Sequence, residues 1–136
     1  MKKLKILLIT ILTAFILCGC GNDISNVSID YGESAIYSKQ DMDDATKVIL
    51  DHFKGWDHGY TLYTVSYSGD EFSLKELEYR RKSNPDIDEC IVFYTSFLTP
   101  DRDNTGFTPN EVHSMWEYIL VRSDNGKWEI VGRGHG

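Results

Sequence analysis

The chain has 136 residues, of which 41% are hydrophobic, and a formal net charge of −7 at pH 7. This length is enough for one folded domain with its own core. The acidic balance argues against nucleic-acid partners, because phosphate contacts need lysine and arginine, and the basic cluster at 80–82 is flanked by acidic residues.

The first nineteen residues predict an export signal. Lys2, Lys3 and Lys5 form a positively charged start, and the apolar run at 6–17 follows it. A transmembrane helix needs about twenty apolar residues, so a run of this length is typical of the apolar region of a signal peptide. We therefore expect export, with residues 1–19 forming the signal peptide.

The end of this signal carries two cysteines in the order Leu17-Cys18-Gly19-Cys20. This order resembles the lipobox of bacterial lipoproteins, in which a small residue precedes the cleavage site and a free thiol follows it. The resemblance implies that Cys20 becomes a lipidated N-terminus on the outer face of the bacterial cell membrane, where each buried CH₂ contributes about 0.8 kcal/mol. Ordinary secretion, with both cysteines as incidental thiols, is the alternative.

The remaining cysteine, Cys90, then has no partner for a disulfide within the chain. It precedes the apolar run IVFYTSF, which reads as a buried strand. We expect a buried and unreactive thiol at this position. A catalytic thiolate is the alternative reading.

After Cys20 the chain divides into a polar segment and a folded domain. Residues 20–37 have no apolar period and predict a flexible tether, so the domain is expected over 38–136. Ser38 is a candidate N-cap with Asp41 in the capping-box position. The apolar residues that follow recur at helical spacing, which predicts an amphipathic helix; they are Met42, Ala45, Val48, Ile49, Phe53 and Trp56.

The rest of the domain alternates strand and helix character. The predicted elements are a strand at 60–67, a short helix at 73–83, a strand at 90–98, and two strands at 114–122 and 128–133. Asn125-Gly126 between the last two strands predicts a tight hairpin. A two-residue turn there places His135 and Arg133 opposite the aromatic residues Trp116 and Tyr118.

This order of elements predicts an α+β fold, with the N-terminal helix packed on an antiparallel sheet of about four strands and a second short helix. It resembles the cystatin-like or nuclear-transport-factor-2-like roll. The chain also resembles a group of short, uncharacterised bacterial lipoproteins, through Phe53 and Trp56 in the helix, Trp116 and residues 118–122 in a strand, and residues 126–128 after it. The resemblance implies a fold and an anchor, and it implies no reaction.

Residues that carry known chemistries are sparse in this chain. No nucleophile elbow, zinc-protease motif, phosphate loop or dinucleotide motif is present, and the four histidines lack metal-ligand spacing. The loop 101–112 approaches a calcium loop at Asp101, Asp103, Thr105 and Gly106, but Val112 stands where a bidentate glutamate is needed. We therefore expect no metal, no cofactor and, on balance, no enzyme.

The sequence favours a membrane-anchored binding or interaction module at the cell surface, for a protein or small-molecule partner. Two alternatives stay open: a small enzyme with a pocket in a cone-like roll, and an accessory structural lipoprotein without a dedicated ligand. The expected binding face is the side of the sheet opposite the helix, with Trp116, Tyr118, Arg133 and His135. Alternatively, Trp116 and Tyr118 are core residues beneath the loop 101–113.

Overall fold

The computed structural model describes residues 21–135, so the predicted signal peptide and Cys20 lie outside the described part. Two helices and five strands follow one another along these residues: β1 Ser28–Asp30, α2 Lys39–Trp56, β2 Thr61–Tyr67, α3 Asp70–Arg81, β3 Glu89–Leu98, β4 Val112–Arg122 and β5 Glu129–His135. The predicted α+β class is confirmed.

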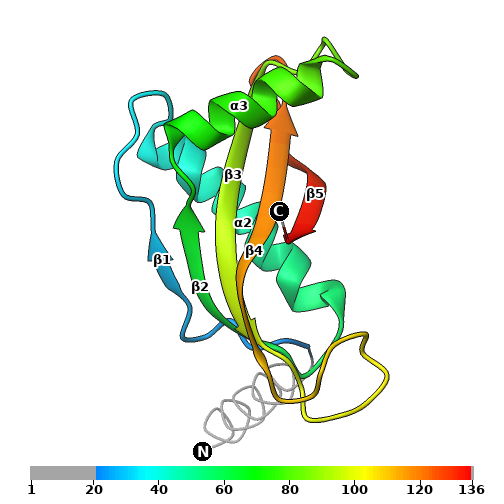
Figure 1. Ribbon diagram of the computed structural model, residues 1–136. Helices are drawn as coiled ribbons and strands as arrows, with labels where there is room; N and C mark the ends of the chain where they lie inside the picture. Colours follow the sequence, from blue (N-terminus) through cyan, green and yellow to red (C-terminus); the bar gives the residue numbers. More distant parts are fainter. Residues whose placement is uncertain (1–20, 136) are drawn as a thin grey trace, which may run out of the picture.

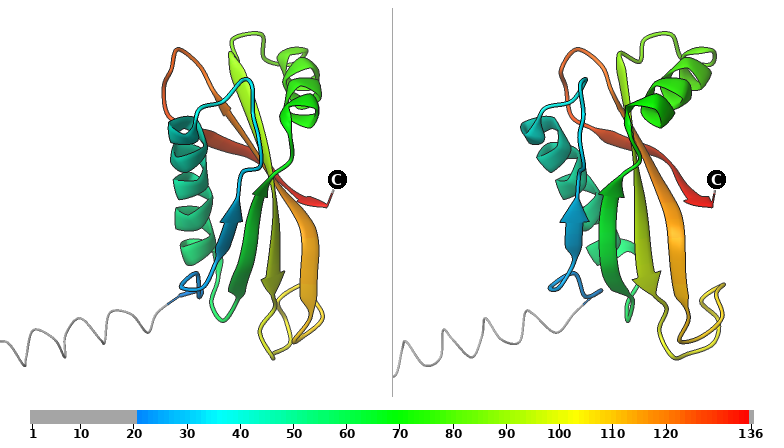
Figure 2. Two further views of the ribbon diagram at one scale, coloured as in Figure 1. Left: turned by 90° about the vertical axis from the view of Figure 1, so that its left-hand side faces the viewer. Right: turned by 60° about the vertical axis from the view of Figure 1, so that its left-hand side comes forward.

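The strands form one sheet in the order β1-β2-β3-β4-β5 (Figure 1). β1 runs parallel to β2, and the other neighbouring pairs are antiparallel. The sheet therefore has one strand more than expected and is mixed. Figure 2 shows α2 against one face of the sheet and α3 against the upper part of the other face, so both faces carry a helix.

Helix α2 begins as its sequence predicts. The Ser38 hydroxyl accepts a hydrogen bond from the Asp41 amide at 3.1 Å, and the Asp41 carboxylate accepts one from the Ser38 amide at 3.0 Å. This capping box satisfies two amides that the first turn leaves without helical partners. The buried side chains of α2 then recur every three or four residues; they are Met42, Ala45, Thr46, Ile49 and Phe53.

The main core lies between α2 and the sheet. It joins the apolar stripe of the helix to alternate residues of β2, β3 and β4, of which Val65, Ile91, Phe93, Phe97 and Leu120 have no exposed surface. Burying an aromatic or aliphatic side chain of this kind contributes about 1.5–3 kcal/mol. This face of the sheet is consequently filled by the protein's own side chains.

A second, smaller core lies beneath α3. Phe72 and Leu77 pack there against the buried residues Ile87, Cys90, Val92, Ile119 and Val121. The Ser73 hydroxyl, fully buried, accepts a hydrogen bond from the Val92 amide at 3.1 Å and so attaches α3 to β3. Leu74 of the same helix is 48% exposed and lies outside this core.

The segment expected to be a tether belongs to the folded unit from its first described residues onward. The Asn22 side chain donates to the Phe53 carbonyl at 2.7 Å and accepts from the Tyr60 amide at 2.9 Å. β1 pairs with β2, and the Tyr37 hydroxyl donates to the Cys90 carbonyl at 2.6 Å. The expectation of a flexible tether is corrected for residues 22–37, because these contacts come from elements distant in the sequence.

The β4–β5 hairpin keeps the predicted register in its outer half. Trp116 pairs with His135 and Tyr118 with Arg133, as expected, but a bulge between Ile119 and Leu120 shifts the inner pairs by one residue. The predicted turn at Asn125-Gly126 is corrected by one residue: the tight turn is centred on Asp124 and Asn125, at φ 53° and 54°, and closes through a 2.9 Å hydrogen bond from the Gly126 amide to the Ser123 carbonyl. Two left-handed central residues are the geometry of a type I′ turn.

Candidate functional site

Of the four residues proposed from the sequence, Trp116, Tyr118 and Arg133 lie on the helix α2 side of the sheet, whereas His135 lines a hollow on the other side. Tyr118 is 1% exposed, and its hydroxyl lies 3.1 Å from His52 Nδ1 of α2. The Arg133 guanidinium lies 5.4 Å from the centre of the Trp56 ring, at the end of the same helix. The predicted position opposite the helix is therefore corrected for Tyr118 and Arg133.

Trp116 belongs to an aromatic cluster at the lower end of this face, and the His135 ring contacts it from the last strand. The Trp116 ring lies 5.6 Å from Phe107 of the 101–112 loop and 5.1 Å from His135. Trp116 is half-buried against the main core. The alternative prediction, in which Trp116 lies beneath the loop as part of the core, describes this position.

Burial governs the titration of the groups on this side. It raises the pKa of Tyr118 to about 12 and lowers the pKa of His52, whose charged form the nearby Arg133 guanidinium also disfavours. A neutral His52 beside a neutral tyrosine suits a packed layer of helix on sheet. The α2 side thus offers a core with polar edges and little room for a ligand.

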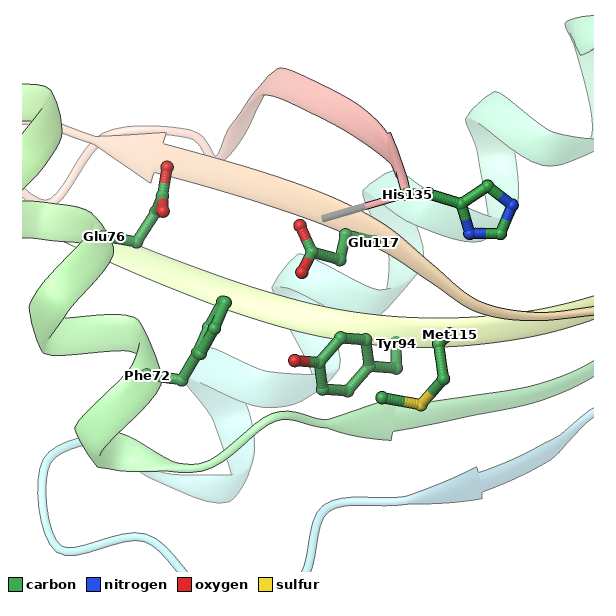
Figure 3. Close-up of a pocket in the computed structure, with 6 residues that line it drawn as sticks. All are labelled: Phe72, Glu76, Tyr94, Met115, Glu117 and His135. Carbon is green, nitrogen blue, oxygen red and sulfur yellow. The ribbon is translucent and has the colours of Figure 1, made fainter.

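The other face of the sheet carries a hollow of about 440 Å³, between the lower side of α3 and strands β3 and β4 (Figure 3). Its volume lies within the range of about 300–1,000 Å³ that ligand sites occupy. The lining residues come from four elements: Phe72 and Glu76 from α3, Tyr94 from β3, Met115 and Glu117 from β4, and His135 from β5.

The backbone of β4 explains how these residues meet. Residues alternate between the two faces along a strand, so Glu117 lies on the α3 side while Trp116 and Tyr118 lie on the α2 side. The bulge opposite Ser96 holds Met115 at φ 56°, and its side chain is 58% exposed at the edge of the hollow. A bulge of this kind redirects a side chain out of the regular alternation.

Glu117 is the most unusual residue of the hollow. The residue is 8% exposed, its carboxylate has no hydrogen-bond or ion-pair partner among residues 21–135, and the carboxylate oxygens stay open to the hollow. Figure 3 shows the carboxylate pointing into the space between β4 and α3. Burial raises the pKa of Glu117, the negative charge of Glu76 raises it further, and a charged His135 has the opposite effect.

The other acidic residue of the hollow has an ion-pair partner. Glu76 accepts a hydrogen bond from Arg80 Nε at 2.9 Å within α3, and both side chains are largely buried. The Tyr94 hydroxyl points toward α3 in Figure 3, and burial together with the charge of Glu117 raises the pKa of Tyr94. The hollow therefore contains one carboxylate that the described residues leave uncompensated.

A larger depression near the start of α3 lacks this feature. It is lined by Glu33, Ser34, Ala35 and Asp70. The Asp70 carboxylate accepts hydrogen bonds from the Ser34 hydroxyl at 2.6 Å, the Ala35 amide at 2.7 Å and the Tyr67 hydroxyl at 2.7 Å. These bonds lower the pKa of Asp70 and fix the N-terminal segment on the domain.

Cys90 lies in the core beneath α3, as expected, and is 1% exposed. Burial raises its pKa to about 12, so the thiolate is too scarce near neutral pH to act as a nucleophile. In the 101–112 loop, the Thr105 hydroxyl bonds to the backbone of Phe107, and Arg102 bonds to Asp57. Residues 21–135 contain no group of three side chains placed to hold a metal ion.

Glu117 is not among the site residues predicted from the sequence. A signal for it is present: in the strand MWEYILV, it is the one acidic residue, and its same-face neighbours Ile119 and Val121 are apolar. A charged residue within a row of buried apolar residues indicates either an oppositely charged partner in the fold or a ligand site. Phe72, Glu76 and Tyr94 carry no comparable signal, because only the placement of α3 brings them to this point.

Comparison of the chain with protein-family models, with curated proteins and with solved structures found no match. Within the part of the chain that the structure describes, no helix has the length and apolar character needed to cross a membrane. The geometry of the hollow is therefore the basis for assigning a function.

Proposed function

We propose that this protein is a lipid-anchored binding module of the bacterial cell envelope, and that the hollow beneath α3 is its ligand site. The observation that carries the proposal is that Glu117, a residue 8% exposed, has no partner among residues 21–135 and keeps its carboxylate oxygens open to the hollow. Partial burial disfavours the charged form of a carboxyl, and it raises the pKa of Glu117. A ligand that offers a hydrogen-bond donor or a positive charge at this point would offset that cost.

The sequence supports the anchor through the order Leu17-Cys18-Gly19-Cys20 after an apolar run. The same proposal includes the finer fold assignment, a roll of the cystatin-like or nuclear-transport-factor-2-like kind. A long helix laid across an antiparallel sheet supports this assignment.

An anchor at Cys20 would hold the domain close to the membrane. Asn22 is bonded to Phe53 and Tyr60, and two extended residues span at most about 7 Å. The end of the domain that carries the last turn of α2 and the 101–112 loop would therefore face the lipid surface. The hollow would open sideways, between the membrane and α3.

The test is a mapping of small-molecule binding on the full-length lipidated protein in a nonionic maltoside detergent. A panel of neutral, anionic and cationic compounds is titrated while backbone amide shifts are followed. We expect at least one compound to shift the amides of Tyr94, Met115 and Glu117 in a saturable manner. A panel in which every saturable shift maps elsewhere, or in which none occurs, contradicts the proposed site.

A further inference from the structure

Resting on the proposed function, we infer that the hollow beneath α3 binds a small organic cation, an ammonium or guanidinium group carried on an apolar body. The cationic ligand is inferred from the uncompensated carboxylate of Glu117, from the apolar wall beside it, and from the volume between them.

The charges around the hollow determine the sign of the charge that a ligand must carry. Glu76 and Arg80 neutralise each other at 2.9 Å on α3, and Tyr94 on β3 and His135 on β5 are the other titratable groups that face the space. Glu117 therefore gives the site a net negative charge whenever His135 is neutral. An anion would be repelled, and a neutral ligand would leave the carboxylate without a counter-charge.

A cation satisfies the carboxylate in a way that the protein does not. Hydrogen bonds between ionised partners are about twice as strong as neutral ones. A metal ion is a poor occupant, because it requires several ligands, and residues 21–135 offer no group of three around one point.

The remaining wall of the hollow is apolar and aromatic. The rings of Phe72 and Tyr94 lie 6.0 Å apart at an angle of 51°, and the Met115 side chain extends along the same side in Figure 3. A cation gains attraction when it lies within about 6 Å of a ring centre. Apolar atoms of the ligand would cover the exposed thioether of Met115, which is otherwise open to water.

The volume of the hollow is large enough for an organic ligand and far exceeds that of a single bound water molecule. A water molecule occupies about 30 Å³ of liquid, whereas the hollow measures about 440 Å³. The space thus suits an arylalkyl amine, with its ammonium group at Glu117 and its apolar part against Phe72 and Met115.

The experiment uses three probes of similar shape on the full-length lipidated protein in maltoside detergent: 2-phenylethylammonium, neutral 2-phenylethanol and anionic 3-phenylpropanoate. The methionine methyl groups are labelled with ¹³C. Met115 lines the hollow, while Met42 is 2% exposed in the opposite core and serves as the internal reference. We expect the ammonium probe to shift the Met115 methyl saturably, with the two other probes at least about tenfold weaker.

The variant Glu117→Gln keeps the shape of the side chain and removes its charge. A charge-assisted hydrogen bond is worth about 1.5–3 kcal/mol, so this variant is expected to weaken ammonium binding by about tenfold to hundredfold. Glu78→Gln, on the exposed side of α3, makes the same change of charge away from the hollow and is expected to leave binding unchanged.

Three outcomes would overturn the inference. Equal binding of the neutral probe rejects the cation and leaves the hollow as a site. Loss of binding to the same extent in Glu78→Gln shows an effect of overall charge instead of a contact. Failure of every probe to shift Met115 rejects the cation and weakens the proposed function as well.

Discussion

Replacing Glu117 by glutamine is expected to stabilise the protein at neutral pH. The variant removes the charge of a residue that is 8% exposed and has no partner among residues 21–135, and whose carboxylate oxygens open into the hollow. Burial of an unsatisfied group costs about 1–3 kcal/mol. We take the lower end, about 1 kcal/mol, because the hollow is open to water and the amide of glutamine also stays unpaired. For a domain of this size, that gain raises Tm by about 4 °C.

The pH dependence of this gain follows from the raised pKa of Glu117. The folded state holds the proton more tightly than the unfolded state, so the wild type loses stability as the pH rises through the folded pKa. The advantage of Glu117→Gln is therefore absent below the ordinary glutamate pKa of about 4.3 and grows above it. The other carboxylates are the same in both proteins, so their contributions cancel in the difference in unfolding free energy between the variant and the wild type.

The assay is urea unfolding followed by tryptophan fluorescence between about pH 4 and pH 8, with ΔG taken from the midpoint at a constant m-value. Glu78→Gln, an exposed change of the same charge, is expected to stay within about 0.5 kcal/mol of the wild type. A Glu117→Gln variant that is less stable than the wild type at pH 7 would refute the reasoning, because Glu117 would then make a favourable contact in the fold.

Three further predictions concern the core, the anchor and the orientation of the domain. Truncation of Tyr118 to alanine, measured by urea unfolding, should cost about 3–5 kcal/mol; a loss near 0.5 kcal/mol would place this ring outside the core. Metabolic labelling with a clickable palmitate should tag the wild type and not Cys20→Ala, and equal labelling of both would contradict the anchor. In vesicles with a nickel-chelating lipid, a spin label at position 103 should relax faster than one at position 86, because β3 separates these ends by about 30 Å; equal relaxation would contradict the proposed orientation.

The sequence predicts the elements whose signals are local. The Ser38 and Asp41 side chains cap α2 through bonds within four residues, and the apolar stripe that follows packs as its spacing requires. The hairpin between the last two strands is also predicted from its turn signal, but the turn lies at Asp124 and Asn125, and the outer pairs from Trp116 to His135 match the predicted register only beyond the bulge. These features depend on neighbouring residues, which is why they can be derived without the tertiary structure.

The features that the sequence does not predict depend on contacts between distant segments. β1 has three residues and exists through pairing with β2, including Ile29 with Val65. Alternation along β4 shows that Trp116 and Tyr118 share a face, but it does not say which helix covers that face. Because α3 packs on the side opposite α2, the open space lies beside Glu117 and not beside the aromatic residues.

The most direct test of the account is the pKa of the Glu117 carboxyl, measured by ¹³C NMR on the full-length lipidated protein. In the free protein we expect a value above the ordinary glutamate pKa of about 4.3, because the carboxyl is buried near Glu76. Saturation with 2-phenylethylammonium should lower this pKa, since an adjacent cation favours the charged form. A pKa at or below the ordinary value in the free protein, unchanged by the probe, would contradict the claim that Glu117 is held ready for a cationic ligand.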